Sequence, residues 1–456
     1  MTNRKRMMKL AAFSHPPGVH RAGWRHPEAA ADGDTDFSVY AHLAQTAERG
    51  KMDAVFFQDS AAVSNCTAIL NGNRARGQMP LAVNLEPASV LPALAVLTKN
   101  IGLISTATTT YNEPYHVARR FATIDHISGG RAGWNLVTSQ VEDESWNFGL
   151  EKHVEHALRY ERATEFYDIV VGLWDSWDAD GLCRDKEAGL YFDIDKVHFL
   201  NHRGKHFNVR GPLNIPRTPQ GRPVVAQAGS SDAGRELAAK SAEVIFTAQS
   251  VMEESRAFMA DVKGRADRYD RGPDDIKILP GILPMVGRTD TEAQDKYEEL
   301  QSLITDDMCR MALQRHTGGV DLSKYPLDGP LPELLPSNAA KARQQILIEM
   351  GRKGMTIRQI GRFFCGSAGH NVMIGSPKTI ADRLEYWFHN EAADGFTVMF
   401  PYMPGSVTDW VDMVIPELQR RGLFRTEYEG RTLRDNLDLK VPESRYARVG
   451  KAAAAE

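Results

Sequence analysis

A short polar turn in the middle of the chain has the composition of an anion-binding site. Residues 226–246 read as the end of a strand, a turn made of Gly229, Ser230 and Ser231, a helix and a second strand. A helix N-terminus carries unpaired backbone N–H groups and the positive end of the helix dipole, so it favours a phosphate. Glycine admits close approach of a ligand, and serine adds hydroxyl donors. The same serines are ordinary helix N-caps, so the turn alone leaves both interpretations open.

Small polar residues also accompany three other apolar runs of the chain. Asp59 follows one run, Thr106 and Asn135 lie within the next two, and Ser139 comes soon after Asn135. Each of them has an ordinary structural explanation as a helix cap or a strand residue. If the runs are parallel strands, however, their carboxyl ends lie on one side of the sheet. Polar groups at several strand ends then suggest one shared pocket.

A predicted helix over residues 153–170 carries a second polar group. His156 and Tyr160 are four residues apart, which places both on one face of that helix. His153, Glu155 and His156 could instead suggest a metal site, but the H-E-x-x-H spacing is absent. We therefore expect no metal ion at this position.

The elements that would position these groups alternate along the chain. Short apolar runs predict eight strands, and segments with helical periodicity fill the intervals between them. Continuous apolar character is typical of parallel strands covered by helices. Eight strands, each followed by a helix, favour an α/β fold of the (β/α)8 TIM-barrel type, with an open doubly wound sheet as the alternative. The predicted strands are 8–13, 52–58, 101–107, 131–137, 222–228, 243–248, 276–287 and 395–401.

Two intervals are too long to be simple connections. Residues 176–221 are rich in Pro, Gly and basic side chains, and residues 306–375 contain Pro-rich and Gly-rich stretches. Such long intervals are usually lids or additional elements. We predict a single barrel domain over residues 1–456, with these two insertions and a C-terminal tail at about 437–456. Basic residues of the insertions that could meet a carboxylated or sulfonated substrate, or simply be solvated, are Arg203, Lys205, Arg210, Arg310, Arg315 and Lys324.

The composition is that of an ordinary globular protein. Apolar residues make up 42% and charged residues 25%, and the formal net charge is −4. This charge gives no electrostatic reason to expect binding to nucleic acids or membranes. The four cysteines are widely separated and form no C-x-x-C pair, which favours reduced thiols. The basic N-terminus lacks the apolar core of a signal peptide, and no apolar run reaches the roughly 20 residues of a membrane span. We expect a cytoplasmic protein.

Several segments resemble the bacterial luciferase-like superfamily, and most closely its two-component flavin monooxygenases. The resemblance runs from about residue 8 to residue 436 and includes "WRHPE", "GKMDAVFFQD", "TTYNEPYHVARRFATIDHISGGRAGWNLVTS" and "QAGSSDAGRE". That branch contains the nitrilotriacetate, EDTA, dibenzothiophene-sulfone and long-chain alkane monooxygenases. The resemblance implies a barrel with insertions that assembles as a homodimer or homotetramer. It also implies that a separate NAD(P)H-dependent flavin reductase supplies reduced FMN, with which O2 oxygenates a small organic substrate.

The resemblance assigns the polar residues to two ends of one FMN site. The phosphate and ribityl end would contact Gly229, Ser230, Ser231, His156 and Tyr160. The isoalloxazine and ribityl edge would contact Asp59, Thr106 and Asn135, and Ser139 is a further FMN-binding candidate.

The implied chemistry requires shielding from water. Reduced flavin reacts with O2 to give a C4a-(hydro)peroxyflavin, which a deep barrel mouth under long insertions would protect, while the protein positions the cofactor. His20 or His316 could hydrogen-bond this species and are the catalytic candidates. Two alternatives remain: a deazaflavin-dependent oxidoreductase on the same barrel, or a non-catalytic flavin-binding protein. The "WNLVTS" and "QAGSSDAGRE" segments favour the oxygenase.

Overall fold

Parallel strands close into a barrel in the computed structural model of this protein, which describes residues 6–447 apart from 64–65, 81–82, 315, 319 and 335–340. The ring consists of β1 (Lys9–Ser14), β2 (Ala54–Phe57), β3 (Gly102–Thr108), β4 (Ala132–Val137), β7 (Val224–Gln227), β8 (Val244–Thr247), β9 (Lys277–Val286) and β11 (Gly395–Met399). Strand β9 closes the ring, because residues 277–280 pair with β8 and residues 281–282 pair with β11. All eight predicted strands are therefore present, and the closed ring excludes the open sheet.

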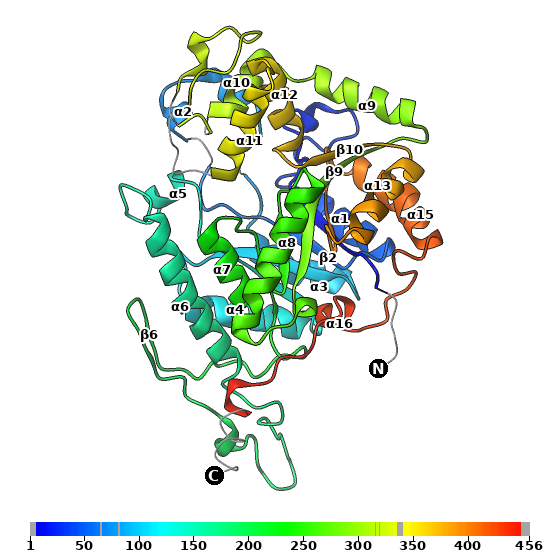
Figure 1. Ribbon diagram of the computed structural model, residues 1–456. Coiled ribbons are helices and arrows are strands. Elements are labelled where there is room, and N and C mark those ends of the chain that lie inside the picture. The colour runs from blue at the N-terminus through cyan, green and yellow to red at the C-terminus, as the bar shows by residue number, and fades with distance from the viewer. Residues whose placement is uncertain are drawn as a thin grey trace.

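Helices cover the outside of the ring (Figure 1). The period of two along each strand sends alternate side chains outward and inward. On β1, Leu10 and Ala12 belong to the apolar cluster shared with the helices, whereas Ala11 and Phe13 belong to the cluster inside the barrel. The covering helices are α1 (Phe37–Arg49), α3 (Pro87–Leu97), α4 (Pro114–Ser128), α6 (His156–Trp174), α7 (Asp232–Ser241), α8 (Met252–Ala266), α13 (Pro377–His389), α14 (Gly405–Asp409) and α15 (Ile415–Arg420).

Aromatic rings form a layer across the barrel interior. Phe13 stacks on Phe56 with ring centroids 5.8 Å apart and on Phe246 with centroids 5.4 Å apart. These three residues come from β1, β2 and β8, so they join opposite parts of the ring. The layer makes the interior a packed core rather than a pore, and a ligand must bind at one end of it.

The insertion at 306–375 lies at the carboxyl end of the strands. It contains α10 (Asp306–Gln314), α11 (Lys341–Arg352) and α12 (Ile357–Ser367), which share an apolar cluster of their own. Helices α2 (Cys66–Leu70) and α5 (Asp143–Trp146), which follow β2 and β4, lie toward the same end, and α9 (Asp290–Ser302) follows β9 (Figure 1). The insertion also supplies a strand that the sequence did not predict, β10 (Asn371–Gly375), which pairs with the second half of β9.

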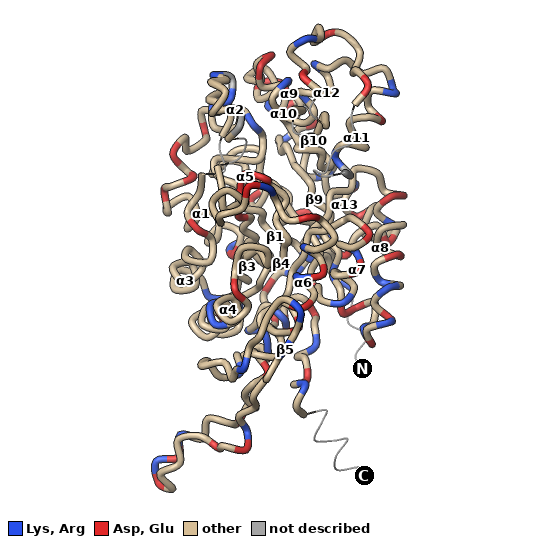
Figure 2. Tube along the Cα trace, turned by 90° about the vertical axis from the view of Figure 1, so that its left-hand side faces the viewer, with Lys and Arg blue, Asp and Glu red and all other residues tan. Residues whose placement is uncertain are grey.

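The insertion at 176–221 occupies the other end of the barrel, where it forms the hairpin of β5 (His202–Arg203) and β6 (Asn208–Val209). Figures 1 and 2 both place this hairpin far from α10–α12. The expectation that both insertions would cover the barrel mouth is therefore wrong for this one. The insertion lies between α6 and β7, so it starts and ends on the amino side of the strands, and it forms its hairpin there.

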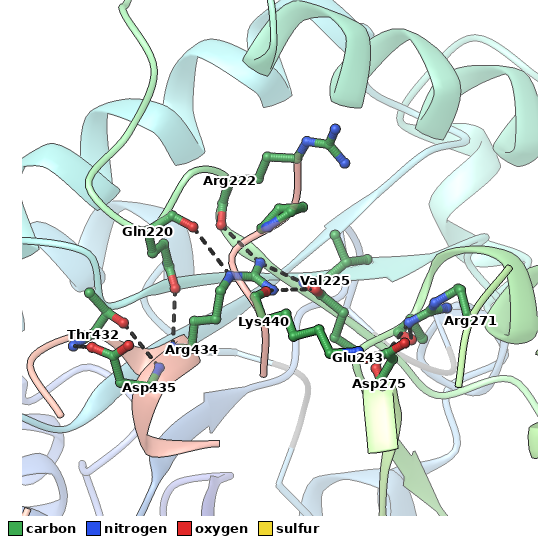
Figure 3. A network of polar contacts seen from close by, with 12 residues as sticks. Gln220, Arg222, Val225, Glu243, Arg271, Asp275, Thr432, Arg434, Asp435 and Lys440 are labelled. Atoms are coloured by element: carbon green, nitrogen blue, oxygen red, sulfur yellow. Dashed lines mark hydrogen bonds and ion pairs between the residues drawn. The ribbon is translucent and has the colours of Figure 1, made fainter. Parts of the chain in front are cut away.

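The C-terminal segment covers the amino end of the barrel. Leu433 and Leu437, in and just after α16 (Leu433–Asn436), belong to the interior apolar cluster. Arg434 forms an ion pair with Glu243 and donates to the carbonyl oxygens of Gln220, Arg222 and Lys440 (Figure 3). Residues 448–456 of the predicted tail lie outside the described residues.

No helix in the described part of the chain combines the length and apolar character that a membrane span requires.

Candidate active site

Thr106 and Asn135 lie next to each other at the carboxyl end of the barrel interior. Ile104 belongs to the interior cluster, so Thr106, two residues further along β3, faces the same interior one layer higher. The Thr106 hydroxyl donates to the Phe57 carbonyl oxygen at 2.9 Å, and Asn135 Nδ2 donates to Thr106 Oγ1 at 2.7 Å. Asn135 is only 3% exposed, and its Oδ1 has no hydrogen-bond partner among the described residues. Leaving a buried acceptor of this kind unpaired costs about 1–3 kcal/mol, so Asn135 Oδ1 is available to a donor group of a ligand.

Ser139 lies just beyond the end of β4 in a left-handed conformation with φ of 57°. Its hydroxyl donates to Thr108 Oγ1 at 2.8 Å, and its carbonyl oxygen accepts from the guanidinium of Arg159. A non-glycine residue in this region is uncommon and tends to occur at functional sites. These contacts hold the loop after β4 against the first turns of α6.

Arg159 is a residue that the sequence reasoning missed. It is buried on α6, and its Nε has no hydrogen-bond partner among the described residues. Burial lowers the pKa of its guanidinium, although Tyr160, Tyr111 and Glu144 act in the opposite direction. Its position three residues after His156 is the signal that could have identified it, since residues at this spacing share a helix face.

The turn of Gly229, Ser230 and Ser231, which we predicted to bind phosphate, forms the capped N-terminus of α7. Ser231 is the N-cap of α7, and its hydroxyl accepts from the Gly234 backbone N–H at 3.2 Å. His156 Nε2 lies 3.5 Å from the same hydroxyl, and the rings of His156 and Tyr160 are 4.7 Å apart. The N-cap interpretation of the turn is thus confirmed, and His156 and Tyr160 lie beside it.

Glycines bring the turn and the tyrosine together. A Cβ atom added to Gly229 would lie 3.2 Å from the Tyr160 hydroxyl and 3.1 Å from the Cα of Gly234. Any side chain here would fill the space between the turn and α6. Ser230 contributes its carbonyl oxygen to Arg235 Nε at 3.1 Å. The turn therefore presents backbone groups and hydroxyls rather than apolar side chains.

The Thr106–Asn135 pair and the turn that begins at Gly229 are linked through neighbouring strands. Asn135 on β4 is the register partner of Ala226 on β7, and the turn begins at Gly229. The Gly229 N–H donates to Oε1 of the buried Gln227 at 2.8 Å. The carboxyl ends of β3, β4 and β7 thus bring both groups to one side of the barrel mouth.

Asp59 follows β2 and is partly buried. Its carboxylate accepts from the Ser60 backbone N–H at 2.9 Å. Burial raises the pKa of Asp59 to about 6, and the negative charges of Glu86 and Glu144 add to this effect. A carboxyl group that titrates near neutral pH can hold or release a proton at the mouth.

His20 and His316 lie on the other side of the mouth, against α12. His20 is fully buried in the loop after β1, and its Nδ1 accepts from the Ala22 backbone N–H at 3.1 Å. Burial lowers the pKa of His20 to about 3, with Arg21 and His26 contributing. The neutral ring therefore carries its proton on Nε2, which has no partner among the described residues. His316 follows α10, and its ring centroid is 5.5 Å from that of Phe364.

The sequence profile of the family described as luciferase-like monooxygenase matches residues 18–395. The chain belongs to this family.

Two characterised members of the luciferase-like family resemble the chain over nearly its whole length. N-acetyl-S-(2-succino)cysteine monooxygenase of Bacillus subtilis (strain 168) is 48% identical over 451 residues, which is 98% of this chain and 100% of that protein. Nitrilotriacetate monooxygenase component A of Aminobacter aminovorans is 48% identical over 447 residues, which is 97% of this chain and 99% of that protein.

A solved structure of a riboflavin lyase, with modified FMN and riboflavin, has a similar fold. It superposes with a TM-score of 0.79 at 29% identity and covers 94% of this chain and 95% of that one.

In this luciferase-like chain, the histidines considered as metal ligands have other contacts. His153 Nδ1 lies 2.6 Å from the Tyr111 hydroxyl, and His156 faces Ser231. No group of three or more His, Cys, Asp or Glu side chains within the described residues could hold a metal ion.

Proposed function

We propose that this luciferase-like protein is the oxygenase component of a two-component flavin monooxygenase. It takes reduced FMN from a separate NAD(P)H-dependent flavin reductase and uses O2 to oxygenate a small organic substrate. The observation that carries the proposal is the buried Asn135 Oδ1, which has no partner among the described residues and lies one layer above the barrel core. An acceptor in this position suits the N–H donors of a reduced isoalloxazine ring.

The residues present fit FMN at both of its ends. Asn135, Thr106 and Asp59 offer hydrogen-bonding groups for the ring edge, and Ser139 lies between them and α6. The turn at the start of α7 contains Ser230 and Ser231, and His156 and Tyr160 lie beside it. Backbone N–H groups at this helix start favour a phosphate. The guanidinium of Arg159 adds a positive charge close to this end.

Bound reduced FMN supplies the electrons and reacts with O2, while the chain binds, orients and shields it. The insertion at 306–375 excludes water from the mouth. His20, neutral throughout the physiological range, offers its Nε2–H as a hydrogen-bond donor to a bound oxygen atom. His316 is the second candidate for this role.

The relatives support the two-component assignment without defining the substrate. One is named as component A of a monooxygenase, and the solved structure of another contains a modified FMN. The named substrates differ, since one relative acts on nitrilotriacetate and another on N-acetyl-S-(2-succino)cysteine. Assembly as a homodimer or homotetramer is part of the same proposal.

An anaerobic titration tests the proposal. The purified protein is titrated with oxidised FMN, photoreduced FMN, reduced riboflavin and a reduced deazaflavin, and air is then admitted to each complex. We expect reduced FMN to bind more tightly than reduced riboflavin and to be reoxidised by O2 while bound. Preferential binding of the deazaflavin would support the oxidoreductase alternative. Binding of FMN without reoxidation would support a non-catalytic flavin-binding protein.

A further inference from the structure

Two partly buried arginines at the barrel mouth lack the partners that buried arginines normally have. Arg21 lies in the loop after β1, and Arg343 lies on α11. The Arg21 guanidinium donates no hydrogen bond to any residue in the described ranges; only its backbone N–H is engaged, with the Cys365 carbonyl oxygen at 2.9 Å. Arg343 Nη2 bonds the neutral ring of His370 at 2.9 Å, while its buried Nη1 has no described partner.

Three arginines that are buried elsewhere in the chain show how different this is. Arg131 donates to four backbone carbonyl oxygens and to the Thr98 hydroxyl. Arg425 pairs with the carboxylate of Asp53 at 2.6 Å, and Arg434 pairs with Glu243. Each of these three guanidinium groups has a carboxylate or several carbonyl oxygens as partners, as the cost of burying a charge requires.

The two mouth arginines also act on each other unfavourably. Burial lowers the pKa of Arg343 to about 10, and the positive charge of Arg21 lowers it further. Burial likewise lowers the pKa of Arg21. A guanidinium retains its charge under these conditions, so the arrangement is costly by itself. A bound anion would remove both the desolvation cost and the repulsion.

Arg343 lies over the barrel core, and a cavity opens next to the loop that carries Arg21. The His370 ring, which contacts Arg343, stacks on Phe246 of the interior aromatic layer with centroids 5.2 Å apart. Its Nδ1 has no hydrogen-bond partner among the described residues. A cavity of about 700 Å³, lined by Trp24, Met79 and Arg76 among others, opens beside the loop that carries Arg21. This volume suits a small organic molecule. Arg76 adds a further positive charge, and Arg21 acts on its pKa.

We propose that Arg21 and Arg343 bind an oxyanion group, a carboxylate or a sulfonate, of the substrate, and that Arg76 supports them from the cavity wall. This inference rests on the proposed oxygenase function, because it assigns the substrate class of the same barrel mouth. The planar guanidinium matches such a group with two parallel hydrogen bonds. Lys205 pairs with Glu161 near the hairpin at the opposite end, and Arg315 lies outside the described residues.

Calorimetric titration of the full-length protein tests the proposal without flavin. The probes are succinate, ethane-1,2-disulfonate and the neutral dimethyl succinate, which share a two-carbon spacer. The variants are Arg21→Gln and Arg343→Gln, with Arg362→Gln on the exposed face of α12 as the matched control. We expect one of the two anions to bind the wild type and the Arg362→Gln control. The same anion should bind Arg21→Gln and Arg343→Gln, the two mouth variants, about tenfold or more weakly. The tighter anion identifies the oxyanion as carboxylate or sulfonate.

Several outcomes would overturn the proposal. These are binding of neither anion to the wild type, equal affinity for wild type and mouth variants, or equal affinity for dimethyl succinate and succinate. Where a glutamine variant does not fold, Arg21→Lys and Arg343→Lys replace it, because lysine retains the charge but not the planar pair of donors.

The same samples are titrated with FMN and riboflavin. A mouth variant that loses the preference for FMN over riboflavin would place the cofactor phosphate at these arginines and overturn the proposal. Failure of wild-type protein to bind FMN would refute the proposed function alone, because the anion titration contains no flavin.

Discussion

The side-chain amide of Asn135 donates a 2.7 Å hydrogen bond to the Thr106 hydroxyl, which donates in turn to the carbonyl oxygen of Phe57. This chain of bonds runs across β4, β3 and β2 and orients the Asn135 amide. One N–H of the Asn135 amide and the Thr106 hydroxyl are engaged in these bonds, and the buried side-chain oxygen of Asn135 is available as an acceptor for a ligand. The barrel therefore offers an acceptor of fixed direction at its mouth.

Replacing Asn135 with leucine should weaken flavin binding without unfolding the protein. The change removes an unsatisfied buried oxygen and leaves the Thr106 hydroxyl bonded to Phe57, so we expect the free energy of unfolding to change by less than about 1 kcal/mol. The affinity for reduced FMN should fall about tenfold or more. Thermal unfolding and anaerobic titration measure the two effects. Thr397→Val, at another buried polar position inside the barrel, should leave FMN affinity unchanged.

Replacing Asp59 with asparagine should stabilise the protein at high pH. The pKa of about 6 lies above the ordinary value of 3.8, so the folded state takes up a proton more readily than the unfolded state. The stability associated with this proton is present below about pH 4 and is lost as the pH rises through 6. The asparagine amide carries no charge at any of these pH values, so the variant should be about 1–3 kcal/mol more stable than wild type at pH 8 and equal to it at pH 4.

Melting temperatures at the two pH values test this prediction. The exposed Asp295 supplies the control, since Asp295→Asn should shift neither value. An equal gain from Asp59→Asn at pH 4 and pH 8 would contradict the role of the buried charge. If Asp59 also contacts flavin, the stabilised variant should bind reduced FMN more weakly, as expected when a functional residue is replaced.

Replacing Ser231 with glycine should separate the helix cap from the phosphate site. Glycine is a tolerable N-cap and costs only a few tenths of a kcal/mol, whereas the hydroxyl is lost entirely. We expect about tenfold weaker binding of FMN and unchanged binding of riboflavin, which has no phosphate. Ser376→Gly makes the same change at the N-cap of α13 and should alter neither affinity. Equal losses for both flavins would remove Ser231 from the phosphate site.

Replacing Arg434 with methionine should destabilise the protein strongly, because Glu243 would be buried without its partner. Burial opposes ionisation of Glu243, but Arg434 and Arg271 outweigh it, so the pKa of this carboxyl lies below its ordinary value. Loss of one member of a buried pair costs about 3–5 kcal/mol. Adding Glu243→Gln should recover part of that loss. Arg420 is exposed and pairs with Glu417 at the surface, so Arg420→Met should change the free energy of unfolding by about zero and serves as the control.

The pH dependence of this variant has a definite sign. The wild-type pair contributes stability above the ordinary pKa of a glutamate, and that stability is lost as the pH falls through the lowered pKa of Glu243. In Arg434→Met the carboxyl can be protonated more easily, so the difference in melting temperature should narrow from pH 8 to pH 5. A constant difference would indicate that Arg434 acts through its backbone contacts alone.

Local patterns predicted the elements but missed features that depend on distant partners. The eight ring strands are continuous apolar runs, and Ser231 is recognisable as a helix start from its neighbours. Strand β10 was missed because its five residues stand in a Gly-rich segment and become a strand by pairing with β9. The covering role expected of the 176–221 insertion was wrong because the insertion connects a helix to the next strand, and in a (β/α)8 barrel such connections begin at the amino end of the strands.

The amino-acid sequence by itself determined where strands and helices form, which turn starts a capped helix and which family the chain resembles. These properties depend on residues a few positions apart, whose periodicity and capping act locally. Only the tertiary structure decided that Asn135 lies next to Thr106, that Arg159 supports Ser139, and that Arg21 and Arg343 share one mouth. These pairs are separated by up to several hundred residues, and their meeting depends on how the ring closes and where α10–α12 pack upon it.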